Sequence, residues 1–341
     1  MDFTPLFKPE AIAVIGVSLK NDRHPANVIY NKIHLRYPVK VYPVNPRGGR
    51  LRRDTVYTDI AEIPARIDLA VIAARADFVP DIMESCIQHD VGGATVISGG
   101  FAESGRADLQ NRLVAMAREA DFPFIGPNCL GIYVPSRFDT FFLPGERLVR
   151  PEPGRVAIIS QSGGVLVDQM VKFAEQGVGL SLAVSIGNKA LIRELDLLTH
   201  LAADPGTSVI AFYIEGFEKN EGRTFVQTAA RVPKPIIVLK AGKTADGCRA
   251  VSSHTAYLAG GRWWRMIQIT LSMALALYSA VLILGAIFIW LYTEFRTRRT
   301  LWVLEKQHFW RCVFCGYTYL DEDNQPISEC PRCLSLNSAQ D

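Results

Sequence analysis

The sequence lacks a strong charge of either sign. Its 341 residues include 37 Lys and Arg against 34 Asp and Glu, which gives a formal net charge of +3. The basic residues are spread along the chain, whereas proteins that bind nucleic acid concentrate them on one face or segment. We therefore expect no nucleic acid partner. The N-terminus also lacks a basic segment followed by an apolar one, so we expect no secretory signal there.

Cysteine is scarce until the end of the chain, and the glycine-rich fingerprint of dinucleotide sites is absent. Cys86, Cys129 and Cys248 are scattered through the first three quarters of the sequence and are interpreted as free thiols in a reducing compartment. No G-x-G-x-x-G motif follows a predicted strand, so binding of a nicotinamide or flavin cofactor is not supported. No segment repeats at solenoid spacing.

Short apolar runs alternate with amphipathic stretches up to about residue 250. Continuous apolar strands separated by helices are typical of parallel sheets that helices cover on both faces. We predict a doubly wound α/β domain over residues 1–142, a linker rich in Pro, Gly and charge over 143–155, and a second, smaller α/β domain over 156–261. The expected strands are Ala11–Val17, Val39–Asn45, Leu69–Ala74, Ala94–Ser98, Phe122–Ile125, Val156–Ser160, Leu180–Ile186, Val209–Ile214 and Ile236–Lys240.

Small or rigid residues stand at the ends of several predicted strands. The first ends in GVS from Gly16, the second in VNPR from Val44, the fourth is followed by GFAE from Gly100, and the fifth by GPNCLG from Gly126. Ligands of open parallel sheets bind at these carboxyl ends, where a glycine lets a phosphate approach the backbone. Taken alone, the first motif is more simply a tight turn between strand and helix.

Together these motifs strongly resemble the CoA-binding domain of NDP-forming acyl-CoA synthetases and of the succinyl-CoA synthetase alpha subunit. The family motifs read roughly G-A-S, V-N-P-K, G-F-x-E and G-P-N-C-x-G, in the same order. The resemblance implies a Rossmann-like domain with CoA across the strand ends, and with basic side chains pairing with its phosphates. The CoA site that it implies comprises Gly16, Ser18, Lys20, Asn45, Pro46, Arg47, Gly100, Phe101, Gly126, Pro127 and Asn128.

A second candidate site begins at Ser160-Gln161-Ser162-Gly163-Gly164, which joins a predicted strand to a helix. Ser162 can cap that helix, and the free N–H groups at Ser162, Gly163 and Gly164 would form an anion site. From the residues alone an ordinary helix cap is the simpler interpretation. The family resemblance implies instead that the positive end of this helix points at a phosphate carried on a histidine.

The resemblance places that phosphohistidine at His254. The family motif S-H-T-G-x-L-A-G stands here as SHTAYLAG from Ser253. A neutral imidazole nitrogen is nucleophilic near pH 7, and a carboxylate can orient the ring. Glu215 matches the family glutamate in that role, although by itself it is a solvated strand end. Ala256, Tyr257 and Ala190 depart from the family pattern, which puts activity in doubt more than fold.

The leading hypothesis is therefore the CoA-binding, phosphohistidine-bearing half of an NDP-forming acyl-CoA synthetase. The resemblance implies interconversion of acyl-CoA, ADP and phosphate with a small carboxylic acid, CoA and ATP. It also implies an ATP-grasp partner subunit that binds ATP or ADP with Mg. The resemblance ends near Gly260, so the second domain, flavodoxin-like in this family, is expected to be truncated.

The tail has a different character. Met266–Tyr292 contains no charged residue and exceeds the roughly 20 residues that cross a bilayer. Trp263, Trp264, Trp290 and Tyr292 stand at its ends like an aromatic belt. We expect a transmembrane helix over 262–293 and a single-pass membrane protein whose α/β domains are cytoplasmic. A buried core helix is the alternative.

Residues 294–341 carry a second kind of motif. Cys312-x-x-Cys315 and Cys330-x-x-Cys333 are separated by fourteen residues. Four thiolates at such spacing form a closed tetrahedral metal site. The two pairs resemble the knuckles of rubredoxin-like zinc ribbons, with a gap shorter than in true rubredoxins. We therefore expect structural zinc rather than redox iron.

Two rival hypotheses follow from the mismatch between the α/β part and the tail. One is a membrane-anchored CoA-binding or scaffold protein in which His254 does not turn over. The other is a joined chain whose tail, beginning near Met266, is an unrelated small membrane protein with a zinc ribbon.

Overall fold

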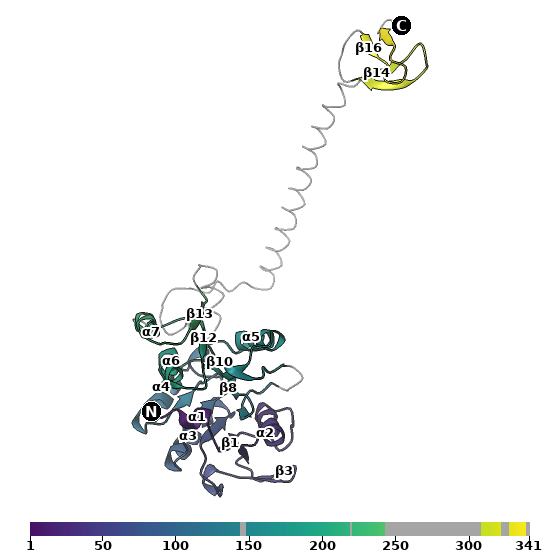
Figure 1. The fold of residues 1–341 in the computed structure, drawn as a ribbon. Helices are drawn as coiled ribbons and strands as arrows, with labels where there is room; N and C mark the ends of the chain where they lie inside the picture. The colour runs from purple at the N-terminus through teal and green to yellow at the C-terminus, as the bar shows by residue number, and fades with distance from the viewer. Residues whose placement is uncertain (144–147, 219, 243–307, 322–326, 339–341) are drawn as a thin grey trace. The chain divides into compact units, whose positions relative to one another are not determined.

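The computed structural model describes residues 1–143, 148–218, 220–242, 308–321 and 327–338 (Figure 1). The chain divides into two compact units, Met1–Arg262 and Trp263–Asp341, and each is described by itself. His254, Ala256, Tyr257 and the segment 266–292 lie outside the described residues.

The first domain is a parallel sheet of five described strands in the order β2-β1-β5-β6-β7. Every residue of β1 is buried, as expected for a strand covered on both faces. The strands are β1 (Ala11–Ile15), β2 (Lys40–Val44), β5 (Leu69–Ile72), β6 (Gly93–Val96) and β7 (Phe124–Ile125). The helices are α1 (Thr4–Phe7), α2 (Pro25–Arg36), α3 (Val79–Gln88) and α4 (Ala107–Glu119), and a small hairpin joins β3 (Gly49–Leu51) to β4 (Asp54–Val56).

The second domain is built on a sheet of six described strands in the order β13-β12-β10-β11-β8-β9. Strands β10 to β13 are parallel, whereas β8 pairs antiparallel with β11. The strands are β8 (Gly131–Val134), β9 (Phe138–Asp139), β10 (Pro153–Ser160), β11 (Leu180–Ser185), β12 (Val209–Ile214) and β13 (Ile236–Lys240). Helix α5 (Gly163–Glu175) lies on one side of this sheet, and α6 (Glu194–Ala203) and α7 (Glu221–Ala229) lie on the other (Figure 1).

These two sheets confirm the predicted α/β fold class, with one difference in how the chain is divided. The predicted first domain includes residues 131–139, but β8 and β9 extend the sheet of the second. One hydrophobic cluster also contains buried residues of both sheets, such as Ile12 and Ile214. The two domains therefore share a core.

A buried ion cluster fixes the chain where it passes between the domains. Lys32 Nζ on α2 lies 2.9 Å from Asp139 Oδ1, and Arg150 Nε donates to Asp139 Oδ2. The Asp139 side chain is 0% exposed. Arg150 also donates to the carbonyls of Leu148 (2.8 Å) and Leu143 (3.1 Å). Because Lys32 and Arg150 both contact this one carboxylate, Asp139 and Arg150 are held against α2.

The second unit contains two similar hairpins. β14 (His308–Arg311) pairs with β15 (Thr318–Asp321), and β16 (Ile327–Glu329) pairs with β17 (Leu336–Ser338). Each hairpin ends in a cysteine knuckle that has the same backbone hydrogen bonds. The N–H of Gly316 donates to Cys312 O at 2.9 Å, and that of Leu334 donates to Cys330 O at 2.8 Å.

The predicted membrane localisation needs correction. No helix among the described residues is long and apolar enough to cross a bilayer. The longest of them, α4 and α5, have 13 residues each. At about 1.5 Å per residue such a helix spans about 20 Å, less than a hydrocarbon core of about 30 Å. The prediction of a single-pass membrane protein is therefore wrong for the described part of the chain, and it is not carried further.

Candidate CoA and phosphate sites

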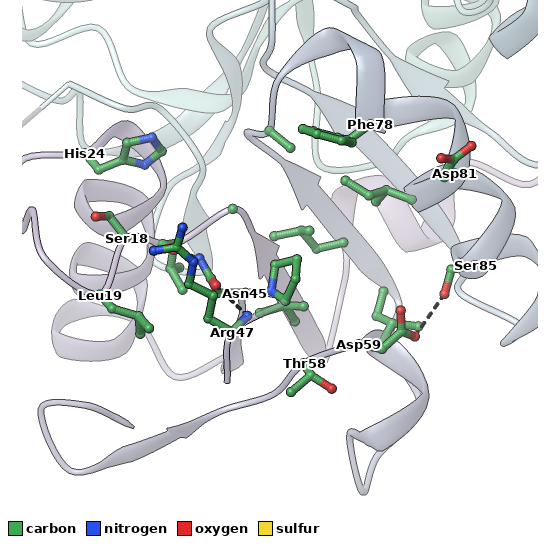
Figure 2. A pocket seen from close by; sticks show the side chains of 18 of the residues that line it. Ser18, Leu19, His24, Asn45, Arg47, Thr58, Asp59, Phe78, Asp81 and Ser85 are labelled. Atoms are coloured by element: carbon green, nitrogen blue, oxygen red, sulfur yellow. Dashed lines mark hydrogen bonds between the residues drawn. The ribbon is translucent and has the colours of Figure 1, made fainter. Parts of the chain in front are cut away.

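The larger candidate site is a cavity of about 740 Å³ at the carboxyl ends of β1 and β2. Ser18, His24 and Arg47 lie on one side of it, and Phe78, Asp81 and Ser85 on the other (Figure 2). The cavity brings together these members of the predicted CoA site: Gly16, Ser18, Lys20, Asn45, Pro46 and Arg47.

Gly16 cannot be replaced without strain at this position. Its φ is +101°, and a Cβ atom built there would lie 2.5 Å from the carbonyl oxygen of Ala73. Its N–H donates to Val44 O at 2.9 Å. The turn after β1 therefore packs closely against the ends of β5 and β2, and its backbone lines the cavity.

Ser18 and Asn45 shape the loops that border the cavity. Asn27, which is fully buried, accepts from the N–H of Ser18 at 2.6 Å and donates to its carbonyl at 2.8 Å. Asn45 Nδ2 donates to Val17 O at 2.6 Å, and its Oδ1 accepts from the N–H of Arg47 at 2.9 Å (Figure 2). The two strand-end loops are thus tied to each other through side-chain amides.

The cavity differs in chemistry from one side to the other. Lys20 and Arg47 are exposed cations at the strand-end loops. Burial lowers the pKa of His24 below its usual value, so this ring is neutral near pH 7. Across the cavity, Ile82 and Phe78 offer apolar surface, and Ser85 Oγ donates to Asp59 at 3.0 Å. This pattern suits a ligand with phosphates at one end and an apolar, ring-containing portion at the other.

A second cavity of about 430 Å³ lies at the N-terminus of α5. Ser162 Oγ accepts from the N–H of Val165 at 3.4 Å, which confirms the predicted helix cap. Glu215, only 3% exposed, contributes from the end of β12. Burial and this carboxylate raise the pKa of Tyr213. The cavity brings together these predicted residues: Asn128, Ser162, Gly163, Gly164 and Glu215.

Four predicted CoA-site residues lie elsewhere. In the described part of the chain, Gly100, Phe101, Gly126 and Pro127 line neither of these two cavities. Gly100 and Phe101 begin a turn whose N–H groups donate to the Glu103 carboxylate. The carbonyls of Gly126 and Pro127 accept from the loop after β11, at 3.1 and 2.9 Å. Both motifs therefore help to form the contact between the domains.

Asn188, on the loop after β11, occupies the centre of that contact. Its Nδ2 donates to Glu103 and, at 2.9 Å, to Gln110. Its Oδ1 accepts from Asn128 at 3.3 Å. Ala190, one of the residues that depart from the family pattern, is 7% exposed and packs in the core of the first domain. A small apolar side chain fits that position.

The four C-terminal cysteines converge on one point. Their sulfur atoms all lie within 4.8 Å of one another, with Cys312 3.5 Å from Cys333 and Cys315 3.7 Å from Cys330. Cys312 and Cys330 are buried, and Cys315 and Cys333 are exposed. Asn337 Oδ1 accepts from the N–H of Val313 at 3.1 Å and so ties the two knuckles together.

Comparison with known proteins assigns both α/β domains. Residues 10–135 match the CoA binding domain, and residues 153–265 match the succinyl-CoA ligase like flavodoxin domain. The chain is 39% identical over 269 residues to the acetate–CoA ligase (ADP-forming) I subunit alpha of Pyrococcus furiosus, covering 76% of this chain and 57% of that protein. It is 40% identical over 260 residues to the acetate–CoA ligase (ADP-forming) I of Archaeoglobus fulgidus, covering 75% and 37%.

A solved structure agrees. The acetyl-coenzyme A synthetase 1 of Ca. Korarchaeum cryptofilum, in complex with phosphate and ADP, superposes with a TM-score of 0.69 at 38% identity, covering 76% of this chain and 56% of that one. The chain is an alpha-subunit-like homologue of the ADP-forming acyl-CoA ligases. It spans 57% of the Pyrococcus furiosus subunit and 56% of the Korarchaeum chain. The cysteine cluster lies beyond residues 153–265, which match the flavodoxin domain.

For this ligase homologue, sequence motifs located the strand-end loops but missed other parts of both sites. His24, Asp59, Phe78 and Ser85 line the larger cavity. Of these four residues, only Phe78 could have been predicted from sequence, because it lies shortly after a strand end. Gln161 also lines the smaller cavity, although its position in the SQSGG motif alone predicts no function for its side chain.

Proposed function

We propose that this chain is the CoA-binding, phosphohistidine-bearing half of an NDP-forming acyl-CoA synthetase. Together with an ATP-grasp partner subunit it would interconvert acyl-CoA, ADP and phosphate with a small carboxylic acid, CoA and ATP. The observation that carries this proposal is the smaller cavity. There, Asn128 of the first domain, the capped N-terminus of α5 and the buried Glu215 line one space.

Each residue group has a distinct role in this proposal. Residues 1–142 bind CoA, with the turns at Gly16, Ser18 and Asn45 presenting backbone to its phosphates and Lys20 or Arg47 pairing with their charge. Residues 156–261 carry the phosphoryl chemistry. The N–H groups at Ser162, Gly163 and Gly164 stabilise negative charge on the phosphoryl group.

The proposed reaction proceeds by one acyl transfer followed by two phosphoryl transfers. Phosphate displaces CoA from the acyl-CoA to give an acyl phosphate and free CoA. A ring nitrogen of His254 then takes the phosphoryl group and releases the carboxylate, while the Glu215 carboxylate orients the ring and compensates its positive charge. Finally His254 passes the phosphoryl group to ADP on the partner subunit, which also supplies Mg. Glu215 is suited to the second step because it is buried at the cavity wall.

The test is labelling by ATP. The chain is incubated with an ATP-grasp subunit of an ADP-forming acyl-CoA ligase and ATP labelled on its γ-phosphate. We expect acid-labile, base-stable label on the wild-type chain, none on His254→Ala, and labelling slowed by about 100-fold on Glu215→Gln. CoA binding by all three should be equal. A wild-type chain that binds CoA but takes up no label would leave a CoA-binding protein without turnover and overturn the proposal.

We also propose that Cys312, Cys315, Cys330 and Cys333 hold a structural zinc ion. A Zn–S distance of about 2.3 Å places tetrahedral sulfur ligands about 3.8 Å apart. The two separations of 3.5 and 3.7 Å are close to this value, and all four sulfur atoms lie within 4.8 Å of one another. All four ligands come from the chain, so the ion would be closed to substrate and would stabilise the two hairpins.

Metal analysis of the purified full chain tests this assignment. We expect about one zinc per chain, retained in the matched variant Cys248→Ser and lost in Cys312→Ser/Cys330→Ser. Iron in place of zinc would contradict the choice of metal. A fully reduced chain without any bound metal would contradict the site itself.

A further inference from the structure

A buried ion pair lies beside the smaller cavity, and the roles proposed above do not use it. Lys189, in the loop after β11, and Glu194, the first residue of α6, are 7% and 1% exposed. Lys189 Nζ lies 3.0 and 3.3 Å from the two carboxylate oxygens of Glu194. Burial raises the pKa of Glu194, and the Lys189 charge opposes that effect. Such a costly pair needs further polar partners to offset its loss of hydration.

Those partners belong to the turn that carries Glu215. Lys189 Nζ donates to Gly216 O at 2.6 Å. Gln161, which is 4% exposed, uses its amide nitrogen to donate to the Glu194 carboxylate and, at 2.9 Å, to Gly216 O. Its amide oxygen accepts from the N–H groups of Glu215 and Gly216 at 2.6 and 3.1 Å.

This arrangement gives the Gln161 amide only one satisfactory orientation. If the amide were reversed, its oxygen would face the Glu194 carboxylate and Gly216 O, while its NH₂ group would face two N–H groups. Both sets of contacts would become repulsive in a buried site, where an unmade hydrogen bond is costly. The charge of Glu194 therefore strengthens the one orientation in which the Gln161 amide oxygen meets the Glu215–Gly216 turn.

We propose that Lys189 and Glu194 are positioning residues for Glu215. They orient Gln161, and Gln161 holds the backbone of the turn so that the Glu215 carboxylate faces the smaller cavity. The inference rests on the proposed function, because Glu215 needs a fixed direction only if it acts on a phosphorylated histidine. Neither Lys189 nor Glu194 lines the cavity, so neither is placed in contact with the reacting atoms.

Two variants test the positioning role. Glu194→Gln is nearly isosteric and removes the charge that fixes Gln161. Lys189→Met/Glu194→Met removes both charges together and leaves no buried charge without a counter-ion. The matched control is Arg155→Met at the opposite end of β10, where Arg155 donates to Ser208 Oγ at 2.6 Å and Pro205 O at 3.0 Å.

The first readout is amide hydrogen exchange in the full chain. We expect the N–H groups of Glu215 and Gly216 to exchange at least about 10-fold faster in both variants and at the wild-type rate in Arg155→Met, since only the variants free the Gln161 amide. The second readout is phosphohistidine formation with the ATP-grasp subunit. Its rate should fall by about 10- to 100-fold, as for the loss of groups that orient a reacting residue, with the Kd for CoA, measured separately, unchanged.

Unchanged exchange at Glu215 and Gly216 would overturn the inference. So would a rate loss matched by Arg155→Met or accompanied by weaker CoA binding, because a general loss of structure would then explain it. If the wild-type chain forms no phosphohistidine, the proposed function fails, and the exchange measurement alone decides whether Lys189 and Glu194 position the turn.

Discussion

Gly16→Ala tests the architecture of the larger cavity directly. An alanine at a φ of +101° costs about 1–2 kcal/mol in backbone strain. Its Cβ would lie 2.5 Å from Ala73 O, although such atoms normally approach only to about 3.3 Å. Relieving that overlap requires β1 and β5 to move apart in a packed core, which adds about 1–3 kcal/mol. We expect the free energy of unfolding to fall by about 2–5 kcal/mol.

The matched control is Gly105→Ala. Gly105 also has a positive φ, of +81°, but no described heavy atom lies within 4 Å of a Cβ placed there. This variant should lose only the strain of about 1–2 kcal/mol. Urea unfolding measures both losses, and titration calorimetry measures CoA binding. Gly16→Ala should raise the Kd for CoA at least about 10-fold, or about 1.4 kcal/mol, because the turn moves into the cavity. Gly105→Ala should leave that Kd unchanged.

Equal losses in the free energy of unfolding and equal Kd values for CoA in Gly16→Ala and Gly105→Ala would refute this explanation. In that case the close approach of Gly16 to Ala73 would not define the cavity. If Gly16→Ala lost stability but kept its CoA affinity, the strand-end turn would be structural only, and CoA would have to bind elsewhere.

Three further predictions follow from buried groups. Asp139→Ala leaves its two buried cationic partners without a counter-ion and should lower the free energy of unfolding by about 3–5 kcal/mol in urea titration. Burial raises the pKa of Cys86 and of Cys129 to about 12 in each case, so mass spectrometry should find both unmodified by iodoacetamide in native protein and modified after unfolding. Burial raises the pKa of Glu103, but its hydrogen bonds, that from Asn188 first among them, outweigh this and lower it below 4.5. The contribution of the Glu103 carboxylate to the free energy of unfolding is therefore complete above pH 4.5 and is lost as the pH falls. We expect wild type to be more stable than Glu103→Gln by about 1–2 kcal/mol at pH 6 and this difference to shrink in acid, as measured by urea unfolding.

The sequence predicted where the parallel strands lie along the chain and which loops follow them. Apolar runs such as Ala11–Ile15 are long enough to identify a strand buried on both faces, and the turn at Gly16 follows directly. The antiparallel pairing of β8 with β11 was missed because the partners are about fifty residues apart and no local periodicity links them.

The role of the GFAE motif was only partly accessible from sequence. Its position after a strand predicted ligand contact, yet Glu103 receives N–H groups of its own turn and the side chain of Asn188 in the second domain. Sequence alone does not distinguish a carboxylate that binds a ligand from one that accepts hydrogen bonds from another domain. The network of Lys189, Glu194 and Gln161 was hidden for a similar reason, since Gln161 lies about 30 residues before the other two in sequence.

The two cavities are built on one continuous frame, and this bears on how CoA and phosphate could react together. Ser98 Oγ donates to the carbonyl of Ala74, which lines the larger cavity. The carbonyl of Ser98 accepts at 2.8 Å from the N–H of Asn128, which lines the smaller cavity. One residue at the end of β6 therefore fixes a wall of each cavity, and Asn188 then locks Asn128 to the second domain. Because the domains also share a core, they would have to separate a packed interface to move independently, so we expect the two cavities to keep a fixed position relative to each other.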